Sequence, residues 1–164
     1  MFTVNDICDI AIQIERNGER IYREAAKRSD DLQMAQLFNW MADEERRHAQ
    51  WFQDLRLPSR VPPEHEEIES MGRSLLREMM ENQPFSLEED RMQAVADLSS
   101  LLNLSIEFEQ DTIMFYEMLC SFIDEAETRE QLNRVIAEEL GHVRQLELMR
   151  GIYAGNNGGG NPAG

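Results

Sequence analysis

The 164-residue chain is poor in cysteine, with only Cys8 and Cys120. Two cysteines exclude a disulfide framework and a metal site built from paired Cys-x-x-Cys motifs, and such a low content is typical of a reducing compartment. No run of about 18 apolar residues occurs, which excludes a membrane-spanning helix. Asp6 and Asp9 lie where a secretory signal needs a basic region and then an unbroken apolar one. We therefore expect a cytoplasmic protein with reduced thiols.

Basic residues are scarce as well. The chain has 16 lysines and arginines against 32 aspartates and glutamates, a net charge of −16. Such a surface repels phosphate backbones, which excludes a general nucleic-acid binder. No basic amphipathic segment is present, so we expect no binding to an anionic membrane surface. With 41% hydrophobic residues, the chain is long and apolar enough to bury the core of one domain.

The alternating pattern of a half-buried β-strand is also absent. The five prolines leave two long proline-free stretches, 1–57 and 85–161. In both stretches apolar residues recur at intervals of three and four, which predicts two helices in each. Turns are expected at Ser29–Asp31, which can cap the second helix, and near Asp124. The predicted fold class is therefore all-α: a four-helix bundle of two antiparallel helical hairpins joined by a long crossover.

The same pattern sets the expected boundaries. We predict the bundle in residues 1–153 and a flexible tail rich in glycine and asparagine in residues 154–164. Within the crossover, a short helix is expected over about residues 64–82. Ser86 and Glu89 have the spacing of a capping box for the helix that follows.

Two of the histidines occur in the same motif, Glu-x-x-His, at Glu45 to His48 and at Glu139 to His142. On a helix, residues i and i+3 project from one face, so each pair can grip a metal ion. Each motif also follows a glutamate by 30 residues, and a tyrosine lies seven residues after that glutamate. The two sets differ by one offset of 94: Glu15, Tyr22, Glu45 and His48, then Glu109, Tyr116, Glu139 and His142. The chain therefore contains an internal repeat of a helical hairpin.

The spacing within each set predicts where the glutamates lie. Residues equidistant from the turn of an antiparallel hairpin are level with each other. The midpoint of residues 15 and 45 is Asp30, and that of residues 109 and 139 is Asp124, both in predicted turns. Each glutamate pair should therefore lie level, about 20 Å from its turn at 1.5 Å per residue. We expect four carboxylates and two imidazoles to point inward at one level of the bundle.

Inward carboxylates at one level need compensation, because they repel one another and lose solvation. Two divalent cations supply a charge of +4 against the −4 of four carboxylates. A donor set of oxygen and imidazole without thiolates suits iron or manganese, and zinc less well. We therefore predict two bound iron ions, with manganese as an alternative.

Four strings carry a resemblance to a known family: IERNGERIY (14–22), ADEERRHAQWF (42–52), IEFEQDTIMFY (106–116) and IAEELGHVRQL (136–146). The chain resembles the ferritin-like di-iron carboxylate superfamily, in its rubrerythrin-like branch, over about residues 5–150. The resemblance implies six metal ligands: Glu15, Glu45, His48, Glu109, Glu139 and His142. It further implies that Glu45 and Glu139 bridge the two ions. Tyr22 and Tyr116 match the tyrosines that hydrogen-bond to ligand carboxylates in that family.

Two features depart from the rubrerythrin pattern. Rubrerythrins carry a rubredoxin-like domain with four cysteines, which this sequence lacks, so we expect the electron donor to be external or absent. They also carry an extra glutamate three residues after the third-helix ligand. Here that ligand is Glu109 and the later residue is Thr112. The iron movement that uses the extra glutamate is therefore not expected in this chain.

Other residues are assigned to the surface or to the core. Glutamates beside the ligands are out of phase with the buried stripes and are expected to be solvated: Glu44, Glu107 and Glu138. Sulfur-containing residues are expected to be inert core residues, among them Cys8, Cys120, Met34, Met41, Met114 and Met149. His65 has no partner set and is expected to have no role. Gly18, three residues after Glu15, either leaves room for a substrate or permits close helix packing.

The resemblance implies a dinuclear iron oxidoreductase, a di-iron peroxidase or ferroxidase. Bound Fe(II) would be oxidised by peroxide or dioxygen, in oxidative-stress defence or iron handling. A non-catalytic metal-binding or sequestration protein, or the cargo of a larger shell, is the alternative. An oxygenase or a catalase that uses manganese or an organic substrate remains a third hypothesis. A homodimer or higher homo-oligomer is expected, because related proteins commonly pair through bundle faces.

Overall fold

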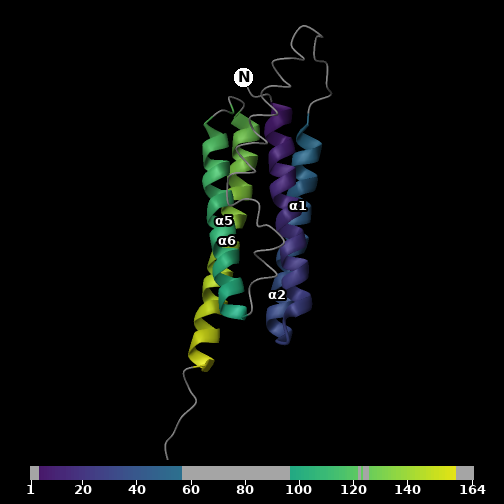
Figure 1. Cartoon of the computed structure of the whole chain (residues 1–164). Helices are drawn as coiled ribbons and strands as arrows, with labels where there is room; N and C mark the ends of the chain where they lie inside the picture. The colour runs from purple at the N-terminus through teal and green to yellow at the C-terminus, as the bar shows by residue number, and fades with distance from the viewer. Residues whose placement is uncertain (1–3, 57–96, 122, 124–125, 158–164) are drawn as a thin grey trace, which may run out of the picture. The chain divides into compact units, whose positions relative to one another are not determined.

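A computed structural model describes residues 4–56, 97–121, 123 and 126–157. The regular structure of these residues is entirely helical, with four helices: α1 (Val4–Arg28), α2 (Leu32–Leu55), α5 (Leu98–Cys120) and α6 (Ala126–Asn157) (Figure 1). No helix among the described residues is both long and apolar enough to cross a membrane. The predicted crossover helix, the capping box at Ser86 and Glu89, and His65 lie outside the described residues.

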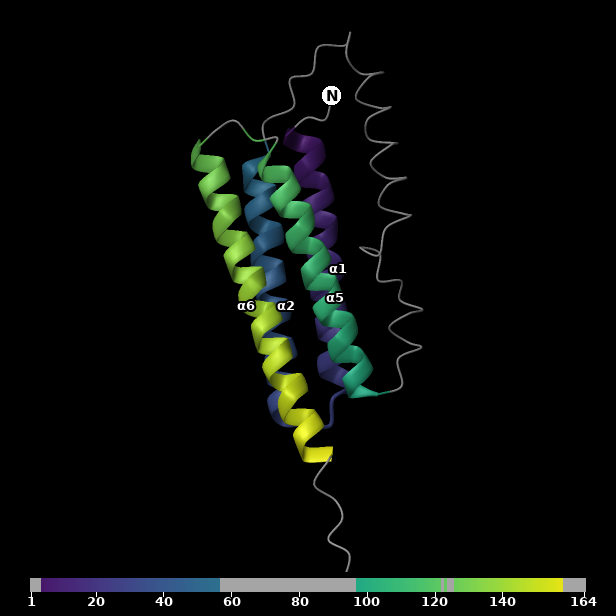
Figure 2. The ribbon, with the colours of Figure 1, turned by 90° about the vertical axis from the view of Figure 1, so that its left-hand side faces the viewer.

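The chain divides into two compact units, Met1–Leu87 and Glu88–Gly164. The first unit contains α1 packed against α2, and the second contains α5 packed against α6. Both views of the ribbon show each pair running side by side (Figure 1, Figure 2). Within the described residues each unit thus contributes one helical hairpin, and the two hairpins correspond to the two halves of the sequence repeat.

The turn of the first hairpin is the one that the sequence predicts. α1 ends at Arg28 and α2 begins at Leu32. Asp31 is the N-cap, and its side chain accepts a hydrogen bond from the backbone N–H of Met34 at 3.0 Å. This bond satisfies one of the amide groups that a helix leaves unpaired at its start.

Apolar faces of α1 and α2 pack into the core of the first hairpin. The buried apolar side chains recur at intervals of three and four and include Ile14, Ile21, Phe38, Met41 and Phe52. The ring of Tyr22 stacks on that of Phe38, with centroids 6.0 Å apart.

Arginines join the two helices of this hairpin on the surface. Arg23 pairs with Asp43 and donates to the Asn39 side-chain oxygen, and Arg56 pairs with Asp9 at 3.0 Å.

The second hairpin begins at a cap that the sequence analysis did not identify. Asp97 is the N-cap of α5, and its carboxylate accepts from the backbone N–H of Ser100 at 2.8 Å. Backbone and side-chain hydrogen bonds from Ser100 hold the pKa of Asp97 below its usual value. α5 ends at Cys120, just before Asp124, near which the sequence predicts the turn. The guanidinium of Arg129 donates to the Ile123 carbonyl at 2.8 Å and 3.1 Å, and these bonds hold that carbonyl in the turn.

α6 is longer than its counterpart in the first hairpin, with 32 residues against 24 in α2. It continues through Asn157, so residues 154–157 are helical although the sequence assigns them to the tail. Residues 158–164 lie outside the described residues. Near this end Arg150 donates to the side-chain oxygen of Asn103 at 2.9 Å and so joins α6 to α5.

Candidate metal centre

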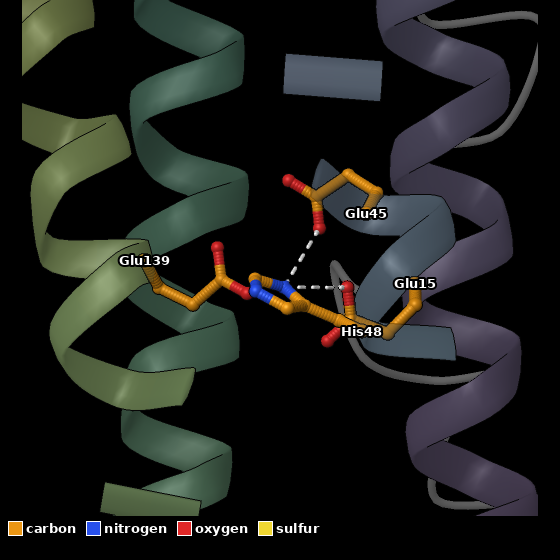
Figure 3. A group of neighbouring side chains, drawn as sticks. All are labelled: Glu15, Glu45, His48 and Glu139. Carbon is orange, nitrogen blue, oxygen red and sulfur yellow. Dashed lines mark ion pairs between the residues drawn. The ribbon is translucent and has the colours of Figure 1, made fainter. Parts of the chain in front are cut away.

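The first hairpin brings three of the predicted ligands together. Glu15 projects from α1, and Glu45 and His48 project from α2. Their exposed fractions are 0%, 1% and 2%. His48 Nδ1 lies 3.6 Å from Glu15 Oε2 and 3.9 Å from Glu45 Oε2 (Figure 3). We call these three residues the first triad.

Helix geometry and the short turn explain the convergence. Glu45 and His48 are separated by three residues, so both point from one face of α2. Because the turn is centred on Asp30, Glu15 on α1 is level with Glu45. The level that the spacing predicts for these two glutamates is the level at which they lie in the hairpin.

The second hairpin repeats the arrangement with Glu109 on α5 and with Glu139 and His142 on α6. The exposed fractions of these three residues are 0%, 0% and 1%. His142 Nδ1 lies 2.8 Å from Glu139 Oε2 and 3.5 Å from Glu109 Oε1. We call these residues the second triad.

The donor atoms of each triad fit a metal ion. In each triad, one ligand atom from every residue lies within 4.8 Å of the others. Two ligands bound to one ion at about 2.1 Å are about 3.0 Å apart at a right angle and about 3.4 Å apart at the tetrahedral angle. Two carboxylates and one neutral imidazole carry a charge of −2, which one divalent cation neutralises. The absence of thiolates in both triads favours iron or manganese.

Tyr22 and Tyr116 are both fully buried. Each lies seven residues after the first glutamate of its triad, which corresponds to two turns of the same helix face. Their hydrogen bonds to ligand carboxylates stay a prediction from the family resemblance.

The charged neighbours of the triads face solvent or pair with a surface residue. Glu107 and Glu138 are exposed, as predicted. Glu44, which was also predicted to be solvated, is instead only 17% exposed and pairs with Arg47. Asp111 is half-buried, and desolvation together with the nearby Glu107 carboxylate raises its pKa. The buried charge of each hairpin is therefore concentrated in its triad.

Two buried hydroxyls flank Glu109 of the second triad, and the sequence analysis singled out only one of them, Thr112. Ser105 and Thr112 lie one turn before and one turn after Glu109, with exposed fractions of 0% and 1%. The Ser105 hydroxyl donates to the Leu101 carbonyl and the Thr112 hydroxyl to the Phe108 carbonyl, both at 2.9 Å. The signal that could have found Ser105 is its spacing of four residues from Glu109.

The sulfur-containing residues agree only partly with the prediction. Met34, Met41 and Cys8 are buried, and desolvation raises the pKa of Cys8 to about 11. Met114, by contrast, is 62% exposed, so its assignment to the core is wrong. It follows Ile113 on the solvent side of α5, one position out of phase with the buried stripe. Cys120 is half-buried and donates to Asn133, so it is less sequestered than expected.

A comparison with protein families matches rubrerythrin over residues 6–150 of the chain. The chain therefore belongs to the rubrerythrin family, within the ferritin-like diiron superfamily. Members of this family typically bind a diiron site, and each hairpin of this chain carries a Glu/Glu/His cluster of the kind that such a site requires.

Two solved structures are similar over most of the chain. One is a Thermotoga maritima protein described as ferritin-like and diiron-carboxylate; it is 24% identical, with a TM-score of 0.64 over 91% of this chain and 95% of that one. The other is a hypothetical protein of Pyrococcus furiosus, 18% identical, with a TM-score of 0.60 over 92% and 90%. The comparison with curated proteins gave no match. The similarity confirms the predicted fold class, an all-α ferritin-like four-helix bundle.

Proposed function

We propose that this protein is a dinuclear iron oxidoreductase that reduces peroxide or dioxygen with oxidation of bound Fe(II). The observation that carries the proposal is the pair of buried Glu/Glu/His triads, one in each hairpin and related by the 94-residue repeat. In the proposed centre the six residues of the two triads would hold two ions, and Glu45 and Glu139 would each contribute a carboxylate to both. Four carboxylates and two divalent ions then form a neutral site.

Each residue of the triads has a defined task in this proposal. Glu15 and Glu109 each bind one ion as the terminal carboxylate. The histidines bind through Nδ1, the ring nitrogen that faces the carboxylates in both hairpins. Iron, when bound, supplies electrons and open coordination positions for the oxidant. The buried side chains around the triads exclude bulk water, and Tyr22 and Tyr116 orient ligand carboxylates through their hydroxyls.

The electron count matches two ions in each chain. Reduction of one hydrogen peroxide to two waters takes two electrons and two protons, and oxidation of two Fe(II) to two Fe(III) supplies the electrons. Return to Fe(II) needs a further reductant, which we expect to be an external donor. Oxidative-stress defence or iron handling is the corresponding role.

The test is anaerobic loading with two equivalents of Fe(II), followed by one equivalent of peroxide. Stopped-flow absorbance should show oxidation that is much faster than for free Fe(II) at the same pH. Glu107→Gln is the matched control, because Glu107 is an exposed glutamate of α5. Oxidation no faster than for free iron would leave the alternative, a metal-binding, sequestration or shell-cargo protein. Turnover only with manganese, or with an organic substrate, would favour the catalase or oxygenase hypothesis.

The tyrosines have a separate test. Tyr22→Phe and Tyr116→Phe keep the buried ring and remove only the hydroxyl. If the hydroxyls orient ligand carboxylates, each variant should bind two metal ions with an affinity about 10-fold to 100-fold lower. Unchanged affinity in both variants would assign the tyrosines to core packing alone.

We also propose a homo-oligomer in the cytoplasm. Apolar side chains on α6 support the oligomer, because Leu140, Leu148 and Ile152 are exposed. The repeat counterparts of the first two, on α2, are the charged residues Arg46 and Asp54. Light scattering of the purified chain should give the mass of two or more copies, and Leu148→Asp should lower it. A monomeric mass for the unaltered chain would contradict the oligomer.

A further inference from the structure

We propose that the two triads fill in order, and that the second triad (Glu109, Glu139 and His142) takes the first metal ion with the higher affinity. This inference rests on the proposed dinuclear centre. It concerns the difference between two sites that carry the same ligands.

The first argument is the distance between donor atoms at matched positions. His142 Nδ1 and Glu139 Oε2 are 2.8 Å apart, whereas His48 Nδ1 and Glu45 Oε2 are 3.9 Å apart. The other pair in each triad is similar, at 3.5 Å for Glu109 and 3.6 Å for Glu15. Ligands of one ion lie about 3.0–3.4 Å apart, so the first triad must contract along both of its distances. In the second triad one distance lies just below this range and the other just above it, so the donor atoms need to move little.

The second argument is the helix face that supports the first glutamate of each triad. Thr112 lies one turn after Glu109, and its β-branched side chain is held by a hydrogen bond to its own helix. The matched residue in the first hairpin is Gly18, which has no side chain. Ser105, one turn before Glu109, is likewise matched by Ala11. Glu109 therefore lies on a helix face between two side chains that hydrogen bonds hold in place, whereas Glu15 has an alanine and a glycine at the matched positions.

Both differences act in the same direction on metal affinity. Ligands that already hold their bound geometry lose less conformational freedom when the ion enters, and this raises affinity. We expect the second triad to bind a divalent ion at least 10-fold more tightly than the first. At a low metal concentration the protein would then hold one ion, and two-electron chemistry would begin only when the first triad fills.

The test is a titration of the full-length metal-free protein with Mn(II), followed by calorimetry and by electron paramagnetic resonance. Two binding steps that differ at least 10-fold in Kd are expected. At one equivalent, the spectrum should be that of isolated Mn(II), and magnetic coupling should appear only with the second equivalent. A single step, or coupled ions from the start, would overturn the ordered filling and leave the dinuclear centre in place.

A matched pair of variants assigns the order. His48→Gln should retain the tight step and lose the weak one, and His142→Gln should lose the tight step. The reverse result would overturn the assignment. Thr112→Ala, which should weaken only the tight step, provides a second variant that leaves all six ligands intact. If the unaltered protein binds no Mn(II) and no Fe(II), the proposed function fails together with the inference.

Discussion

The two hairpins bury the same triad of two glutamates and one histidine but join their helices differently at the surface. In the first hairpin, Arg56 pairs with the carboxylate of Asp9. In the second, Arg150 at the matched position binds the neutral side chain of Asn103. The contact thus joins matched positions in both hairpins, but the group that accepts from the arginine is charged in the first hairpin and neutral in the second. Exposed ion pairs contribute little to stability, so such a contact can change without effect on the buried triad.

The buried faces differ in a way that matters more. Beside the first glutamate, α1 has Ala11 and Gly18, whereas α5 has Ser105 and Thr112 with hydroxyls bonded to their own helix. The comparison teaches that a duplicated ligand set does not make two equal sites. Buried neighbours decide how firmly each glutamate is held.

The largest expected effect comes from the proposed bridging glutamates. Glu45→Gln and Glu139→Gln each remove one buried charge and, in the proposed centre, one ligand of both ions. We expect each variant to lose more than about 100-fold in metal affinity and in the rate of peroxide-driven Fe(II) oxidation, since even outer groups of metal sites are worth 10-fold to 100-fold. Metal analysis and stopped-flow kinetics measure both quantities. If only one variant showed this loss, only one of the two glutamates would be a ligand of both ions.

The next effect is a comparison of the two cores. Phe52→Ala in α2 and Leu146→Ala in α6 truncate fully buried side chains at matched positions of the repeat. The losses in unfolding free energy should be about 3–5 kcal/mol and about 2–5 kcal/mol. Chemical denaturation followed by circular dichroism measures them. If the hairpins unfold together, both variants will show one transition. Two transitions would indicate that one hairpin survives without the other.

Metal removal should destabilise the protein by a smaller amount. An ion present at about 100 times its Kd stabilises the folded state by about 2.7 kcal/mol, which corresponds to a Tm change of about 5–10 °C for a chain of this size. A chelator should therefore lower the Tm by that amount, as measured by scanning calorimetry. An unchanged Tm would contradict metal binding at either triad.

The helix caps provide a smaller and pH-dependent comparison. Asp31→Ala and Asp97→Ala each remove the N-cap of one hairpin, and we expect the Tm to fall by about 2–4 °C in either case. Hydrogen bonds from Ser100 lower the pKa of folded Asp97, so its contribution is present above the unfolded pKa and is lost as the pH falls through the folded value.

Asp97→Asn separates the cap from its charge, because asparagine caps a helix well and does not titrate. The difference in Tm between this variant and the unaltered chain should change below about pH 4, where free aspartate titrates. A constant difference from pH 6 to pH 3 would show that the Asp97 charge adds nothing to the cap.

The smallest effect is expected for Asp9→Asn, which converts the surface contact of the first hairpin into that of the second. The loss should stay below about 1 kcal/mol, because both partners are half exposed. Thermal unfolding at low and high salt measures it, and only the unaltered pair should show a salt dependence from this contact. A larger loss would indicate that this ion pair does more than its counterpart.

Much of the fold and of each triad could be predicted from the sequence. The turn at Ser29–Asp31 and the inward direction of Glu45 and His48 follow from helix periodicity and capping chemistry. The end of α6 could not be predicted, because the helical preference of Ala154 competes with two glycines and an asparagine-rich sequence. The exposure of Met114 was not predicted, because Met114 is apolar and lies one position from the buried stripe of its helix. A step of one residue around the helix decides whether such a side chain faces the core or the solvent.

Spacing along the chain was enough to identify which residues form each triad, because a helix converts sequence separation into position on a face. Only the folded hairpins decided how closely the donor atoms of each triad approach. That distance depends on side-chain rotamers and on packed neighbours, which the linear order of residues does not specify. Both histidines belong to the same Glu-x-x-His motif, yet the distance from Nδ1 to the glutamate of the motif differs between His142 and His48. This difference is therefore a property of packing.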